Sequence, residues 1–146
     1  CAWDGQPRGD GCVGVKGSVV GILSVVYIAR FFGASRLIQD SLVPKSVTVP
    51  IAVTISENIG GETSITSVVV FVVGIFGALI GFSLMRLLHI DDPVARGLAM
   101  GSAAHGIGTA RSIEKGAVEG ALSGLAMALM GVCTALLAPV IARFLY

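Results

Sequence analysis

Two long stretches without a charged side chain, residues 64–85 and 121–142, constrain this sequence more than any other feature. A shorter uncharged run covers residues 17–29, and its flanks, residues 13–16 and 30–34, lengthen it to a comparable span. A helix needs roughly 20 apolar residues to cross about 30 Å of hydrocarbon. Lipid permits only helices or closed barrels, and these runs show no strand-like alternation. We therefore predict an all-α integral membrane protein with about three transmembrane helices.

The composition supports this prediction and excludes other classes of protein. Of the 146 residues, 54% are hydrophobic and 13% are charged, whereas a soluble domain has roughly 25% charged residues. The formal net charge of +1 is too small for a disordered chain or for a nucleic-acid-binding face. The length suits one domain. We expect residues 1–12, which are polar and glycine-rich, to be a leader distinct from a membrane domain of residues 13–146.

Neither a metal site nor a catalytic motif is visible in the sequence. The three cysteines, Cys1, Cys12 and Cys133, are odd in number and lack the spacing of metal ligands. The run Gly106-Ile107-Gly108 matches part of a dinucleotide fingerprint, but no strand precedes it and the third glycine is missing. We predict that the chain is not an enzyme, binds no cofactor or metal, and contacts no nucleic acid.

The two segments that connect the predicted spans are too apolar for ordinary loops. Residues 41–56 contain Pro44 and Pro50, which interrupt a helix, and residues 97–110 contain several glycines. Irregular backbone at membrane depth is tolerated where it lines a cavity. The layout predicts spans that alternate with two discontinuous or re-entrant segments, as part of a larger transporter-like bundle. The alternative is a pair of inert interhelical loops.

Glycines four residues apart recur in three places and indicate close helix contacts. They are Gly77 and Gly81, Gly97 and Gly101, and Gly116, Gly120 and Gly124. Such faces serve either a homo-oligomer interface or packing within one chain, and the sequence leaves both interpretations open.

Charged and hydroxyl side chains concentrate in the two interrupted segments. Lys45, His105 and Arg111 are costly groups to place in lipid, and His105 also titrates near neutral pH. Hydroxyl groups stand near them at Ser46, Thr48, Ser102 and Thr109. Free N–H groups at a broken helix add positive partial charge. Together these groups predict a centre that binds a small carboxylate. Alternatively, Lys45 and Arg111 snorkel to the headgroups and His105 is a structural donor.

The same segments resemble a known family. The run Pro44-Lys45-Ser46-Val47-Thr48-Val49-Pro50-Ile51-Ala52 is similar to one signature of the LrgB/CidB family, and Gly101-x3-His105-Gly106-Ile107-Gly108-Thr109-Ala110-Arg111 is similar to its second. The resemblance covers residues 17–146 and implies the C-terminal portion of a longer membrane protein. With it, the predicted substrate-binding residues are Lys45, Ser46, Thr48, Ser102, His105, Gly106, Gly108, Thr109 and Arg111.

The resemblance implies two kinds of function. Bacterial members are described as antiholin-like or holin-like proteins that affect murein hydrolase export and cell lysis, usually with a small LrgA/CidA-type membrane partner. Related proteins, including the plastid glycolate/glycerate translocator, move small carboxylates, and some bacterial pairs are linked to pyruvate uptake. We expect a carrier for small monocarboxylates in the bacterial cytoplasmic (inner) membrane. The alternative is a holin-type regulator of lysis that acts through oligomerisation.

Overall fold

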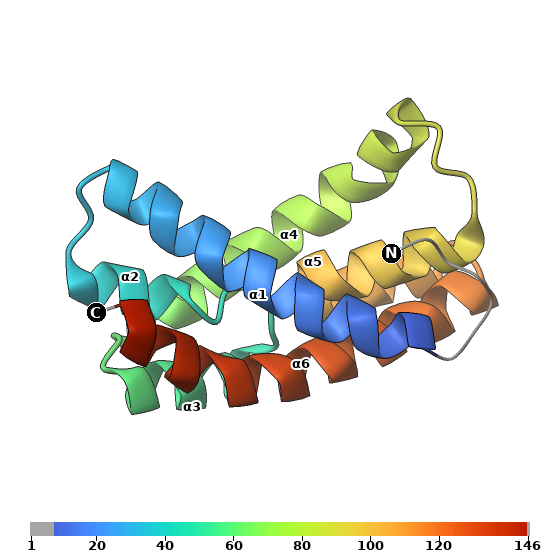
Figure 1. Cartoon of the computed structure of the whole chain (residues 1–146). Helices are drawn as coiled ribbons and strands as arrows, with labels where there is room; N and C mark the ends of the chain where they lie inside the picture. Colours follow the sequence, from blue (N-terminus) through green and yellow to red (C-terminus); the bar gives the residue numbers. More distant parts are fainter. Residues whose placement is uncertain (1–7, 146) are drawn as a thin grey trace.

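The computed structural model describes residues 8–145, and every secondary-structure element in that part of the chain is a helix (Figure 1). The helices are α1 (Arg8–Phe31), α2 (Arg36–Leu42), α3 (Val49–Ile59), α4 (Thr63–Leu87), α5 (Pro93–Ile113) and α6 (Ala117–Leu145). Three of them, α1, α4 and α6, are long and apolar enough to cross a membrane. The predicted all-α membrane fold is therefore confirmed. Residues 8–12 of the expected leader are helical, and residues 1–7 lie outside the described residues.

The long helices carry their apolar residues outward as well as inward. On α4, Val68, Phe71 and Leu79 are 62%, 54% and 71% exposed. Water would penalise such a surface, whereas a lipid environment accepts it. The blue-to-red colouring of Figure 1 shows that α1 and α6 run in the same direction and that α4 runs the opposite way.

Helices α2 and α3 form a short helical hairpin, hereafter hairpin 1, whose turn comprises residues 43–48. The two arms are joined near the start of α4. The Thr66 hydroxyl oxygen there lies 2.7 Å from Ser56 Oγ in α3 and 2.9 Å from the Ser41 carbonyl oxygen in α2. The first residue of α2 and the last residue of α3 also line one cavity. Both arms therefore start from the same end of the bundle, and the turn lies further inside.

Helix α5 is interrupted at His105 and doubles back there, which makes it hairpin 2. His105 has φ 41° and ψ −131°, outside the helical region. A Cβ atom built on Gly108 would lie 2.8 Å from the Met100 carbonyl oxygen, although a straight helix would separate such positions by about 12 Å. Both arms lie along the first half of α6, which contacts Gly101 in one arm and Ile113 in the other.

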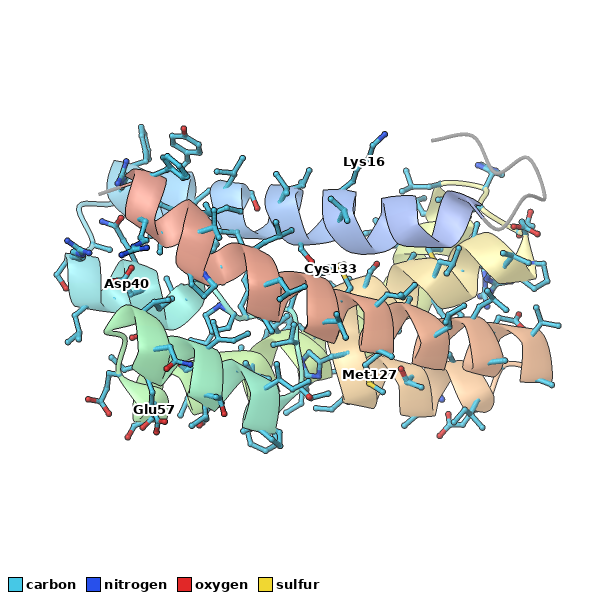
Figure 2. The ribbon with its side chains drawn as sticks, turned by 60° about the horizontal axis from the view of Figure 1, so that its bottom comes forward. Lys16, Asp40, Glu57, Met127 and Cys133 are labelled. Carbon is cyan, nitrogen blue, oxygen red and sulfur yellow. The ribbon has the colours of Figure 1, made fainter. Side chains whose placement is uncertain are left out.

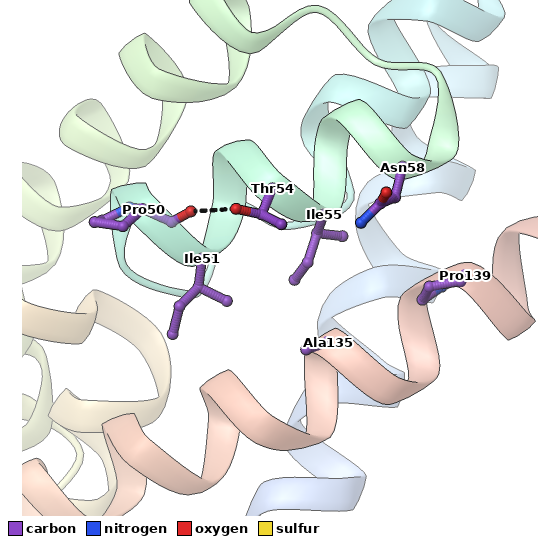
Figure 3. Close-up of a pocket in the computed structure, with 7 residues that line it drawn as sticks. All are labelled: Pro50, Ile51, Thr54, Ile55, Asn58, Ala135 and Pro139. Atoms are coloured by element: carbon purple, nitrogen blue, oxygen red, sulfur yellow. Dashed lines mark hydrogen bonds between the residues drawn. The ribbon is translucent and has the colours of Figure 1, made fainter.

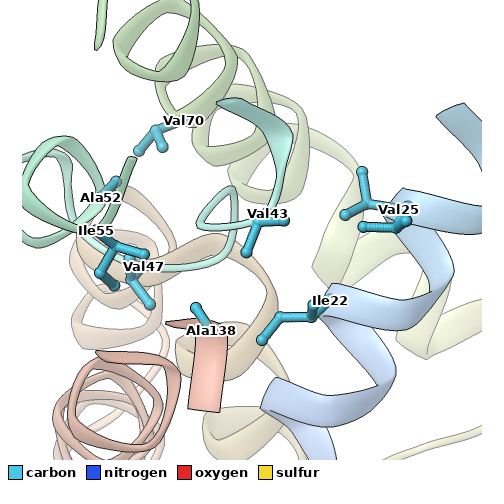
Figure 4. Packing of buried hydrophobic residues seen from close by; sticks show 9 residues of the cluster. Ile22, Val25, Val43, Val47, Ala52, Ile55, Val70 and Ala138 are labelled. Carbon is cyan, nitrogen blue, oxygen red and sulfur yellow. The ribbon is translucent and has the colours of Figure 1, made fainter. Parts of the chain in front are cut away.

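The two hairpins enter the bundle from opposite ends. Hairpin 1 follows α1 and hairpin 2 follows α4, and these two helices run in opposite directions (Figure 1). The turns approach each other at Val70 of α4, whose side chain packs in one buried cluster with Val43 and Val47 of hairpin 1 (Figure 4). The Val70 carbonyl oxygen lies 3.0 Å from His105 Nε2 of hairpin 2. The prediction that two interrupted segments alternate with the long helices is confirmed.

The spaced glycines mostly serve packing within this chain. A Cβ on Gly77 or Gly81 of α4 would meet Ala104 or Met100 of hairpin 2. Gly97 likewise lies against the backbone of α6, where a Cβ would come within 2.6 Å of the Glu119 carbonyl oxygen. These contacts favour the intrachain interpretation, because small residues let helix backbones approach closely in lipid.

Candidate functional site at the hairpin turns

Lys45 lies in the turn of hairpin 1, beside a group of hydroxyls. Its Nζ atom donates to Ser46 Oγ at 3.0 Å, and its side chain is half-buried. Ser46 lines a narrow cavity together with Ser18 of α1 and Thr134 of α6, whose hydroxyl oxygens are 2.9 Å apart. None of the residues that line this cavity is acidic. Lys45 itself does not line this cavity, and the cavity leaves no room for a water molecule, so the contact of its ammonium group that the structure shows is the one with Ser46.

Thr48 closes the same turn and precedes the first turn of α3. Its backbone is extended, with φ −67° and ψ 149°, and its carbonyl oxygen accepts from the Ala52 N–H at 2.9 Å. Pro50 occupies the first turn of α3, where its missing N–H costs no helical hydrogen bond. The positive end of the α3 dipole therefore faces the turn that carries Lys45.

His105 forms the turn of hairpin 2 and is only 4% exposed. A carbonyl oxygen only accepts, so Nε2 donates the hydrogen bond to Val70. In the neutral imidazole this leaves Nδ1 as an acceptor. The absence of a side chain at Gly74 makes room for the ring, because a Cβ there would lie 2.6 Å from His105 Cε1. This geometry agrees with His105 as a structural hydrogen-bond donor. It also places a titratable ring at the turn of hairpin 2.

Thr109 connects the second arm of hairpin 2 to α6. Its hydroxyl lies 2.8 Å from the His105 carbonyl oxygen and 2.9 Å from Ser123 Oγ. Ser123 is fully buried. These bonds fix the chain immediately after the turn. Gly108, one residue earlier, packs against the first arm, and Gly106 approaches Met127 of α6, from which a Cβ would lie 3.9 Å away.

Two predicted site residues are not brought to the turns. Arg111 lies in the last turn of α5, where it pairs with Glu114 and its side chain is 47% exposed. Ser102 lies in the first arm of hairpin 2, and its hydroxyl donates to the Ala99 carbonyl oxygen at 3.1 Å. The turn of hairpin 1 thus carries Lys45, Ser46 and Thr48, and the turn of hairpin 2 carries His105, with Thr109 one helical turn later. Arg111 is about 9 Å further along a helix from His105.

Sequence reasoning missed the hydroxyls that the long helices contribute. Ser18, Ser123 and Thr134 are at most 3% exposed, and all three lie within otherwise apolar runs. A hydroxyl inside a predicted span is a signal that could have found them. The Val70 carbonyl oxygen carries no such signal, because it is a backbone atom. Within the described residues, no group of three His, Cys, Asp or Glu side chains could hold a metal ion.

Comparison with known proteins decides the family. The model of the LrgB-like family matches residues 12–144. This chain belongs to the LrgB-like family. It is 39% identical over 129 residues to the uncharacterized protein YwbG of Bacillus subtilis (strain 168), covering 88% of this chain and 57% of YwbG.

Other relatives of this LrgB-like chain carry a functional name. Over 131 residues it is 34% identical to the antiholin-like protein LrgB of Bacillus cereus (strain B4264), covering 90% of this chain and 57% of that protein. The antiholin-like protein LrgB of Bacillus anthracis (strain CDC 684 / NRRL 3495) matches to the same extent. The chain thus spans 57% of the length of these relatives. No solved structure matches it.

Proposed function

We propose that the full-length protein acts as an antiholin-like membrane protein that controls murein hydrolase export and cell lysis. The observation that carries this proposal is the similarity to antiholin-like LrgB proteins over 90% of the chain. The three apolar helices agree with action inside a bilayer. We further propose that it lies in the bacterial cytoplasmic membrane, has no catalytic role, and works with a small LrgA/CidA-type membrane protein.

A carrier for small monocarboxylates of the pyruvate or glycolate type is the second candidate. The observation in its favour is the pair of hairpins that enter from opposite ends and approach each other at Val70. Transporters place substrate sites where such broken helices meet, with helix ends and a few polar side chains directed at the substrate. Lys45 would attract the carboxylate, and His105 would accept or release a proton.

The test is to express the full-length parent, with its small partner, in a host that lacks its own LrgB-type genes. Detergent-induced lysis and uptake of labelled pyruvate, glycolate and glycerate are measured in the same cells, with membrane expression checked. The variants are Lys45→Gln and His105→Gln. Lys115→Gln is the matched control, since it removes a lysine charge outside the turns.

The two readouts separate the candidates. Altered lysis without uptake of any of the three acids supports the antiholin-like function and removes the carrier. Uptake that Lys45→Gln and His105→Gln abolish, while Lys115→Gln preserves it, supports the carrier. A lysis rate unchanged by expression of the parent contradicts the antiholin-like proposal.

Oligomerisation is tested by Gly124→Trp. A Cβ at Gly124 meets no atom within 4 Å, whereas a Cβ at Gly120 would lie 2.8 Å from Ile113 Cγ1. Open space beside Gly124 therefore makes this position the better place for a bulky residue that blocks an intermolecular contact. If self-association drives lysis control, Gly124→Trp changes both chemical crosslinking and lysis. Unchanged crosslinking and lysis would remove oligomerisation through this glycine face.

A further inference from the structure

A groove runs between α3 and α6 on the side of hairpin 1 (Figure 3). Its volume is about 400 Å³, within the range of about 300–1,000 Å³ that ligand sites occupy. The lining is largely apolar: Pro50, Ile51, Thr54, Ile55, Asn58, Ala135 and Pro139. The Thr54 hydroxyl donates to the Pro50 carbonyl oxygen at 3.1 Å, so its proton is used within α3. The wall is suited to a hydrocarbon chain.

The groove continues into a second cavity that is basic. The two cavities share Asn58 and Pro139, and the second one is also lined by Arg36 and Arg143. Arg36 begins α2, and Arg143 lies in the last turn of α6. An apolar channel therefore ends at two guanidinium groups and one amide, which are donors that match the oxygens of a phosphate.

This basic end lies where a membrane interface is expected. Phe31 at the end of α1 and Phe144 near the end of α6 are 86% and 88% exposed. Arg30 and Arg143 lie in the last turns of the same two helices, and arginines near the ends of spanning helices hold their charge at the level of the headgroups. An arginine pair at this level, with the apolar groove running from it toward the bilayer centre, has the polarity of a phospholipid.

We propose that this groove holds one anionic phospholipid, with an acyl chain along α3 and α6 and the phosphate at Arg36 and Arg143. Basic pockets between transmembrane helices bind acidic headgroups in this way. Two acids near this end are Asp40 and Glu57 (Figure 2), and with Asp40 paired to Arg36 the two arginines still leave the cavity one net positive charge. Asp40 contacts Arg36 at 3.5 Å, but the Arg36 side chain stays 65% exposed. Glu57 precedes Asn58 in α3 and lines neither cavity.

The test uses the full-length parent, extracted with phosphatidylglycerol or phosphatidylcholine and examined by native mass spectrometry. Arg143→Gln removes one guanidinium of the headgroup site. Arg86→Gln is its matched control, because Arg86 is likewise an exposed arginine in the last turn of a spanning helix. Ala135→Phe fills the groove, and Ala128→Phe is the control at an exposed position of α6 outside the lining.

We expect phosphatidylglycerol to be retained and phosphatidylcholine to be lost. Arg143→Gln should weaken retention of phosphatidylglycerol about tenfold, which is the loss of one charge-assisted contact, and Arg86→Gln should leave it unchanged. Ala135→Phe should abolish retention, unlike Ala128→Phe. Addition of inorganic phosphate should not displace the lipid, because it lacks the acyl chain. Equal retention of both lipids, equal effects of the two arginine variants, or retention in Ala135→Phe would overturn the proposal.

Discussion

Replacing Gly74 by alanine should disturb the turn of hairpin 2, although the change adds a single methyl group. A Cβ at this position of α4 would lie 2.6 Å from His105 Cε1 and 2.8 Å from Ile107 Cδ1. The His105 ring cannot easily give way, because it is buried and its Nε2 atom donates to the Val70 carbonyl oxygen. The added methyl group therefore both strains the packing of α4 against hairpin 2 and breaks this hydrogen bond.

The change in the free energy of unfolding combines two destabilising effects and one stabilising effect. Overpacking in a filled interior costs about 1–3 kcal/mol, and loss of a buried hydrogen bond costs about 1–3 kcal/mol. Alanine in place of glycine returns about 1 kcal/mol through helix propensity. The balance is a destabilisation of about 1–5 kcal/mol, with about 3 kcal/mol as the central value.

The measurement is the stability of the full-length parent in mixed micelles, titrated with sodium dodecyl sulfate and followed by circular dichroism. Gly124→Ala is the matched control, since a Cβ there meets nothing within 4 Å and the change should stabilise by up to about 1 kcal/mol. Gly81→Ala should cost less than Gly74→Ala, because the atom in the way is the flexible thioether of Met100. A Gly74→Ala variant as stable as Gly124→Ala would refute the packing of His105 against α4.

Three further substitutions test other contacts by the same titration. Thr66→Val removes a fully buried hydroxyl that bonds both arms of hairpin 1 and should destabilise the protein by about 1–3 kcal/mol. If it destabilises no more than Thr54→Val, a substitution at an exposed position, Thr66 does not hold the two arms together. Ser123→Ala removes the hydrogen bond to the Thr109 hydroxyl of hairpin 2 and should destabilise the protein by about 1 kcal/mol, whereas Ser102→Ala should change its stability very little. Equal losses of stability would count against the Ser123–Thr109 hydrogen bond. Asp92→Ala removes the N-cap that accepts from the Ala95 N–H at 2.8 Å and should cost about 1 kcal/mol; an unchanged midpoint would show that the cap does not stabilise α5.

The long helices could be predicted from the sequence because their cause is local. An uncharged run of sufficient length has to cross the bilayer as a helix, whatever its neighbours are. The interruption of hairpin 1 was predictable for the same reason, since Pro44 cannot donate a backbone hydrogen bond. The position of the turn in hairpin 2 was predicted only as a glycine-rich segment. That the reversal falls on His105 depends on its contact with α4.

The site was predicted less completely, because its members come together through tertiary packing. Lys45 and His105 are predicted as site residues because they are charged or titratable groups in apolar segments, and both lie at hairpin turns. Arg111 has the same chemical character and lies at the outer end of an arm, where it pairs with Glu114. Because α5 doubles back at His105, Arg111 lies away from the turn. The spacing of residues along the sequence cannot show that reversal.

The arrangement of the two hairpins can be tested directly by labelling single cysteines in the full-length parent, with its native cysteines replaced. Glu57→Cys marks the outer end of hairpin 1 and Lys115→Cys the outer end of hairpin 2, and both positions are exposed. A membrane-impermeant maleimide is applied to intact and to permeabilised cells. Four basic residues, Arg86, Arg96, Arg111 and Lys115, lie toward the outer end of hairpin 2, against Arg30, Arg36 and Arg143 toward the outer end of hairpin 1, and Lys45 lies in the turn of hairpin 1. Because the more basic side is the cytoplasmic one, we expect Lys115→Cys to react only after permeabilisation and Glu57→Cys to react in intact cells. Labelling of both cysteines from the same side would contradict the entry of the hairpins from opposite faces of the membrane.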